Sequence, residues 1–135
     1  MTLHFPLLIL VIIVYNVLVF FTGISLDGQI FSVTMVSGVD WSFKVSEALV
    51  LLALVLLFLE ILKATRTGTG AVLDHLLSTA VFIIALVEFI LVAQAATTTF
   101  FLLVIISLLD VIAGFSVGLT AARRDFTVGH PGGLS

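Results

Sequence analysis

The chain has 135 residues, of which 61% are hydrophobic and 10% are charged, and its mean hydropathy is +1.40. A water-soluble domain usually has about 25% charged residues, so this composition excludes an ordinary soluble protein and predicts a membrane protein of one domain. The sequence has no cysteine, which excludes disulfides, thiolate metal sites and cysteine nucleophiles, and its formal net charge of −3 includes no basic run suited to nucleic acid.

Four apolar segments reach the length of about 20 residues that a membrane-spanning helix requires. The first is too long for the core of a signal peptide, so we interpret it as a retained helix. The predicted fold class is an all-α membrane protein, a four-transmembrane-helix bundle in one domain over residues 1–126, with a flexible cytoplasmic tail at 127–135. The helices are expected at about 5–24, 45–64, 76–96 and 100–121.

The positions of lysine and arginine predict the orientation of these helices. Lys63 and Arg66 lie in the connector between the second and third helices, Arg123 and Arg124 lie in the tail, and the first connector contains only Lys44. With four spans, the clustered positive charges fall on the same side as the N-terminus. The positive-inside rule makes that side cytoplasmic, so both termini are expected there.

The connector between the first two helices is the one sizeable element expected outside the membrane. Apolar and polar residues alternate through 31–35 and again through 41–45, and the turn residues of 36–40 separate the two stretches. This alternation around a glycine-containing turn predicts an extracytoplasmic β-hairpin over about 30–45, with an irregular interfacial loop as the alternative. We expect the hairpin to lie apolar side down on the outer face of the bilayer, with Trp41 as the membrane-interface anchor.

Three polar residues are expected near the middle of the membrane. A rise of about 1.5 Å per helical residue places Asn16 roughly 15 Å, Asp110 roughly 16 Å and Glu88 roughly 18 Å from the ends of their predicted helices, near the centre of a core of about 30 Å. An ionisable side chain at that depth costs at least a few kcal/mol and is a functional candidate. Because no basic residue is expected there, the two acids and Asn16 are candidates to hold a proton or to bind a cation.

Small residues form a stripe along each of the third and fourth helices. The stripes contain Glu88 and Asp110, and a short connector joins the two helices, so we expect the helices to pack through the stripes with both acids facing inward. Two alternatives are that the acids only hydrogen-bond the helices together, or that they contact another subunit. The expected helix-packing residues, which include a GxxxG pattern, are Ala85, Ser107, Gly114 and Gly118.

The remaining polar residues favour structural roles. Glu60 precedes Lys63 by three residues near the end of the second helix, which predicts an interfacial ion pair. His4, His75 and His130 lack the spacing of metal ligands, so neither a metal site nor a cofactor is predicted. The sequence has no nucleophile beside a base and no nucleotide-binding glycine loop, so an enzyme is the least supported functional class. Within that class, an intramembrane hydrolase is the alternative that remains.

Several segments resemble a group of small, uncharacterised four-helix proteins of the bacterial inner membrane. The resemblance implies a multi-pass protein of that membrane with cytoplasmic termini, and it implies no activity. The small multidrug transporters share the size and helix number but resemble the chain poorly, because their essential glutamate is in the first helix, where this chain has Asn16. The resemblance lies in Phe58–Gly68, Asp74–Ser78, Val81–Ile83, Leu86–Phe89, Asp110–Phe115 and Ala121–Phe126.

The leading functional hypothesis is therefore a non-enzymatic inner-membrane protein that self-associates or belongs to a larger membrane assembly. Its expected partners are the lipid bilayer and either further copies of itself or another membrane-protein subunit, and its acid centre would comprise Glu88 and Asp110. One alternative is a small proton- or cation-coupled transporter or channel subunit, and another is an accessory subunit of a larger complex. Transport predicts a hydrated route to Glu88, whereas an accessory role predicts a dry acid pair and an apolar outer face.

Overall fold

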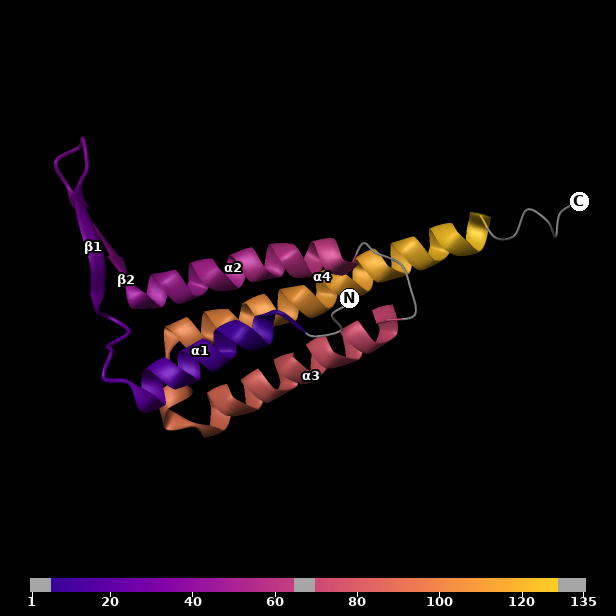
Figure 1. The fold of residues 1–135 in the computed structure, drawn as a ribbon, viewed down its shortest axis with the longest axis horizontal. Coiled ribbons are helices and arrows are strands. Elements are labelled where there is room, and N and C mark those ends of the chain that lie inside the picture. Colours follow the sequence, from indigo (N-terminus) through magenta and orange to yellow (C-terminus); the bar gives the residue numbers. More distant parts are fainter. Residues whose placement is uncertain (1–5, 65–69, 129–135) are drawn as a thin grey trace, which may run out of the picture.

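Four α-helices and one β-hairpin make up residues 6–64 and 70–128, which are the residues that this computed structural model describes (Figure 1). Side-chain surroundings are described for residues 6–63 and 72–116. In chain order the elements are α1 (Leu8–Phe21), β1 (Gln29–Thr34), β2 (Asp40–Lys44), α2 (Val45–Ala64), α3 (Gly70–Leu91), the short 3-10 helix η1 (Ala93–Ala95) and α4 (Thr98–Val128).

The helices alternate in direction, and α4 lies between α2 and α3 (Figure 1). Helix α4 makes its most extensive contacts with these two helices, and α1 packs less extensively against all three others. The hairpin projects from one end of the bundle, which we call the hairpin end. The opposite end, where α2 finishes and α3 begins, is the distal end.

The prediction of a helical chain with four helices and a small hairpin is confirmed, and α2 has the bounds that were predicted. Within the described residues, three helical stretches are long and apolar enough to cross a membrane: Val45–Lys63, Val72–Leu91 and Thr98–Ser116. Helix α1 has only 14 residues, which corresponds to about 21 Å, less than a hydrocarbon core of about 30 Å. The predicted start of this helix, at residue 5, lies outside the described residues.

The third and fourth helices differ in their bounds from the prediction. Helix α3 ends at Leu91, five residues before the predicted end at residue 96, because the backbone becomes extended at Val92 (φ −101°, ψ 119°). Helix α4 continues to Val128, past the predicted end at residue 121. The remainder of the predicted tail, 129–135, lies outside the described residues. Residues 65–69, in the connector between the second and third helices, also lie outside them.

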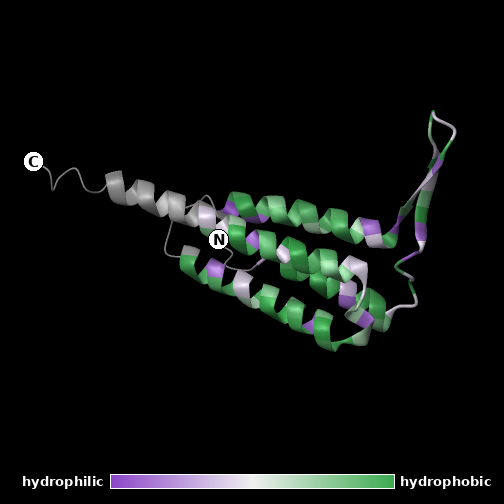
Figure 2. Cartoon of the chain, turned by 180° about the vertical axis from the view of Figure 1, so that it is seen from behind, coloured by the Kyte–Doolittle hydropathy of each residue, from purple (hydrophilic) through white to green (hydrophobic). Residues whose placement is uncertain are grey.

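The core of the bundle consists of apolar side chains from all four helices, while many of the other apolar side chains face outward. Figure 2 accordingly shows helices that are hydrophobic on most sides, with polar residues near their ends. A helix that is apolar all round is typical of a membrane span or the interior of a large protein. The fully or nearly buried apolar residues are Leu8, Val11, Ile12, Tyr15, Leu49, Ala53, Leu56, Val81, Ala85, Ala95, Phe100, Leu103, Val104 and Ile106.

The β-hairpin also forms where it was predicted. Strands β1 and β2 are antiparallel, and Phe31 pairs with Phe43 while Val33 pairs with Trp41. The turn is closed by hydrogen bonds between Met35 and residues 38 and 39, and it needs glycine at position 38, where φ is +92°. Period-two alternation therefore identified both strands and the turn between them.

Strand β2 leads into α2 without an intervening residue. The first N–H groups of a helix have no partner inside the helix, and here neighbouring groups supply those partners. The Lys44 N–H donates to Glu47 Oε1 at 2.9 Å, and the N–H groups of Val45 and Ser46 donate to carbonyl oxygens of the 26–28 loop at 2.9 Å each. The base of the hairpin is thus fixed to the first turn of α2.

Candidate functional site: two polar clusters

Polar side chains from α2, α3 and α4 meet near the distal end of the bundle. Lys63 Nζ lies 3.0 Å from Glu60 Oε1, within α2, and 3.5 Å from Asp74 Oδ1 on α3. Asp110 on α4 makes side-chain hydrogen bonds with Ser78 and Glu60. We call these five residues the distal cluster, and it ties three helices together.

Two acids of the distal cluster are shielded from solvent, whereas the side chain of the third, Asp74, is 24% exposed. Glu60 is 5% exposed and Asp110 is 6% exposed. Glu60 Oε1 and Asp74 Oδ1 accept no hydrogen bond within the described residues, although both are buried. The ammonium group of Lys63 is therefore what compensates for their burial, since a buried charge needs a partner.

The distal cluster contains three carboxyl groups and one ammonium group. An ionised carboxylate can only accept hydrogen bonds, so the bond between Glu60 and Asp110 requires a proton on one of the two. Within the described residues, no three acidic or histidine side chains are arranged to hold a metal ion. The arrangement is therefore suited to holding a proton between two carboxyl groups, with Lys63 balancing one of the two negative charges that remain.

A second group of polar side chains lies at the hairpin end. The hydroxyl of Tyr15, on α1, donates to the carbonyl oxygen of Gln94 at 2.9 Å and lies 2.8 Å from Thr97 Oγ1. Thr97 in turn caps α4, because its Oγ1 accepts a hydrogen bond from the N–H of Phe100 at 3.1 Å. Helix α1 thus holds the turn between α3 and α4.

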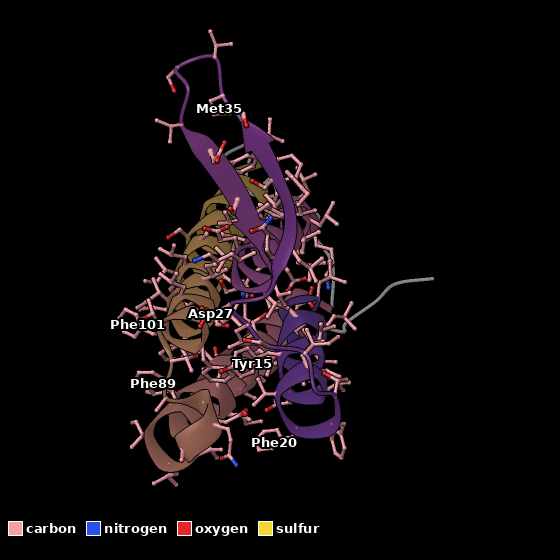
Figure 3. All side chains as sticks on the ribbon, turned by 90° about the vertical axis from the view of Figure 1, so that its left-hand side faces the viewer. Tyr15, Phe20, Asp27, Met35, Phe89 and Phe101 are labelled. Atoms are coloured by element: carbon pink, nitrogen blue, oxygen red, sulfur yellow. The ribbon has the colours of Figure 1, made fainter. Side chains whose placement is uncertain are left out.

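The ring of Tyr15 also contributes to this contact. It is fully buried inside the bundle (Figure 3) and meets the ring of Phe100 edge to face, with centroids 4.8 Å apart. Beside it, Asn16 Nδ2 donates to Glu88 Oε1 at 3.3 Å and to the carbonyl oxygen of Ile12 at 3.0 Å. We call Tyr15, Asn16, Glu88, Gln94 and Thr97 the hairpin-end cluster.

The structure places Glu88 and Asp110 in different clusters, so the expected joint acid centre does not form within the chain. Glu88 lies three residues before the end of α3, about 5 Å along the axis, and not near the middle. Asp110 contacts Ser78, which precedes Glu88 by ten residues on α3, about 15 Å. The shift of the end of α3 from residue 96 to Leu91 accounts for the difference.

The other predicted residues are distributed as follows. The Glu60–Lys63 ion pair is present. Ala85, Ser107 and Gly114 are buried, and Ser107 bonds within α4 to the carbonyl oxygen of Leu103 at 3.0 Å. The surroundings of Gly118 lie outside the described residues, as do His4 and His130.

Sequence reasoning missed the central role of Tyr15. It placed Asp74 and Ser78 on the same stripe of the third helix as Glu88, but did not name them as site residues. Tyr15 is the single tyrosine of the chain and lies on an otherwise apolar helix directly before Asn16. A buried tyrosine hydroxyl usually has a hydrogen-bond partner, so that position was the available signal. Its partner on the backbone, Gln94, has no signature in the sequence.

No protein-family model, no curated protein and no solved structure matches the chain. The resemblance to small four-helix proteins of the bacterial inner membrane therefore stays a prediction.

Proposed function

We propose that the chain is a non-enzymatic integral membrane protein that works as a subunit of a membrane assembly, formed either with further copies of itself or with another membrane protein. Four helices span the bilayer, with α1 completed by flanking residues, and both termini face the cytoplasm of a bacterial cell. The distal cluster then lies at the cytoplasmic side and the hairpin at the outer side. The function of the protein is to contribute a rigid helical unit to the assembly.

The observation that carries the integral-membrane part of this proposal is the apolar outward face of α2 and α3. These helices expose large apolar side chains along their length while few polar groups interrupt them. Lipid covers such a surface as well as protein does, so small differences in packing decide which of the two contacts it. On α2 the outward residues are Leu51, Leu52, Leu54, Val55, Phe58, Leu59 and Leu62.

The separation of the two clusters supports an assembly role over transport through a single bundle. Thr97 and Asp110 are 13 positions apart on the chain, about 20 Å along α4. The buried side chains of α4 between them are apolar except for Ser107, which bonds to its own helix. A permeating ion needs polar groups along its route, and this segment of the core supplies almost none.

Within this proposal, the distal cluster positions helices and stores a proton. Glu60, Lys63, Asp74 and Asp110 connect α2 to α3 and α4. Buried charged groups of this kind favour one arrangement of the helices, because any other arrangement leaves a charge without its partner.

Photo-crosslinking in native membranes tests the assembly role. The chain has no cysteine, so single cysteines carrying a benzophenone maleimide can be placed on α2 and α3. Val55→Cys, at a position that is 50% exposed, and further outward positions are compared with Ala53→Cys, at a position that is 0% exposed. We expect protein adducts of defined mass from some outward positions and none from Ala53→Cys.

Two results would contradict the proposal. Only lipid adducts from every outward position would indicate a monomer in the bilayer. Proton flux through reconstituted vesicles that is lost in Asp110→Asn would instead support the transporter alternative.

A further inference from the structure

The β-hairpin has one aromatic face and one hydroxyl-rich face. Phe31, Trp41 and Phe43 pack against one another, with ring centroids 5.2 to 5.9 Å apart. On the opposite face Ser32 pairs with Ser42, and Thr34 pairs with Asp40, whose Oδ1 accepts a hydrogen bond from Thr34 Oγ1 at 2.7 Å. The hairpin is therefore amphipathic across its thickness.

The helices do not cover the aromatic face. Phe31 and Trp41 are each 44% exposed although they contact one another. The turn beyond them is also apolar and exposed, with Met35, Val36 and Val39 at its surface. Residues 28–39 contain no charged side chain, so an acidic or basic protein surface would find no complementary charge along this stretch.

The hairpin extends sideways from the bundle. Two perpendicular views show it steeply inclined to the helices, with Met35 near its far end, where the turn begins (Figures 1 and 3). It begins where the apolar stretch Val45–Lys63 begins, and its base is bonded to the first turn of α2. If α2 spans the bilayer, the hairpin leaves it at the level where hydrocarbon meets headgroups and runs parallel to the membrane surface.

We propose that the hairpin is a lipid-binding arm that lies in the headgroup region beside the bundle, with Phe31, Trp41 and Phe43 toward the acyl chains and the hydroxyl-rich face toward water. Aromatic side chains are favoured at this level because their rings are amphipathic. A planar boundary between apolar and polar media also matches the two faces of the hairpin better than a uniformly apolar or uniformly polar partner does. The arm rests on the membrane placement proposed above.

Trp41 is the single tryptophan of the chain and therefore a native fluorescent probe of the aromatic face. The protein is reconstituted into phosphatidylcholine vesicles at high lipid-to-protein ratio, and quenching by doxyl groups at two depths on the lipid is compared with quenching by aqueous iodide. We expect blue-shifted emission, strong quenching by the shallow doxyl label, weaker quenching by the deep label and little quenching by iodide.

Two matched variants test the faces and the membrane placement separately. Trp41→Phe combined with Ser42→Trp moves the probe to the neighbouring position on the hydroxyl-rich face, where iodide should quench it. Trp41→Phe combined with Leu54→Trp places the probe on the outward face of α2, where only the lipid labels should quench it. Unchanged helical circular dichroism verifies that each variant folds.

Iodide quenching of Trp41, together with lipid quenching at position 54, would overturn the arm while leaving the membrane placement intact. Protection of Trp41 from both quenchers would also overturn it, because the face would then be covered by protein. Iodide quenching at position 54 would overturn the membrane placement and the arm together.

Discussion

The two polar clusters hold the same bundle by different physical means. The hairpin-end cluster connects α1 to the turn between α3 and α4 through hydrogen bonds of Tyr15, most of them between neutral groups. The distal cluster connects α2 to α3 and α4 through Lys63 and three carboxyl groups. Neutral hydrogen bonds depend little on pH, whereas charge pairs depend on protonation. The Tyr15 contacts at the hairpin end are thus expected to depend little on pH, and the charge pairs of the distal cluster to depend on it more strongly.

The largest loss of stability is expected from a substitution that removes a charge from the distal cluster. Replacing Lys63 with Met removes the ammonium group that compensates Glu60 and Asp74, and breaking a buried ion pair in this way costs about 3 kcal/mol. Denaturation in detergent at several pH values measures the loss. The loss should be smaller at acidic than at alkaline pH, since a protonated carboxyl group needs no counter-charge.

Two further variants serve as controls for this prediction. Lys44→Met removes a lysine from the exposed hairpin and should change stability by less than about 0.5 kcal/mol. Adding Glu60→Gln to Lys63→Met should recover part of the loss, because one uncompensated carboxylate is removed. Equal stability of Lys63→Met and the native chain at every pH would show that the distal cluster does not hold the helices.

An intermediate effect is expected at the hairpin end. Tyr15→Phe keeps the ring beside Phe100 but leaves the carbonyl oxygen of Gln94 without its donor, at a cost of about 1 kcal/mol. The unfolding free energy should fall by the same amount at acidic and alkaline pH. A pH-dependent loss would contradict the distinction drawn between the two ends.

The smallest effect is expected at Glu88. Glu88→Gln keeps an oxygen that accepts the hydrogen bond from Asn16 Nδ2, and polar contacts between membrane helices average only about 0.6 kcal/mol. The variant should therefore remain within that amount of the native stability. A loss of stability as large as that of Lys63→Met would contradict this prediction, because it would show that the charge of Glu88 is important for the fold.

The sequence predicted the faces of the helices better than the levels of residues along them. Heptad spacing marked the small-residue stripe of α3, and its residues Ser78, Val81 and Ala85 are indeed buried. Levels depend on where a helix ends, and the apolar run around Leu91 and Val92 contains no glycine or proline that marks the end. Glu88 was therefore assigned to the correct face of α3 but to the wrong position along the helix.

The hairpin and the distal cluster differ in the same way in how far the sequence predicted them. The hairpin was predictable because alternation and a turn glycine are local signals. Only the Glu60–Lys63 pair of the distal cluster was predictable. The contact between Glu60 and Asp110 was not, because it joins residues 50 positions apart and depends on α4 lying between α2 and α3. Local patterns determine elements, whereas the partners of a polar side chain depend on how the elements pack.

The direct joint between β2 and α2 has a geometric consequence. An α-helix has 3.6 residues per turn, so each residue rotates the chain by about 100° around the helix axis. Inserting one alanine between Lys44 and Val45 would swing the hairpin by that angle around α2 while the rest of the helix kept its packing. The rotation of α2 about its own axis therefore determines the direction, seen along the bundle axis, in which the hairpin projects.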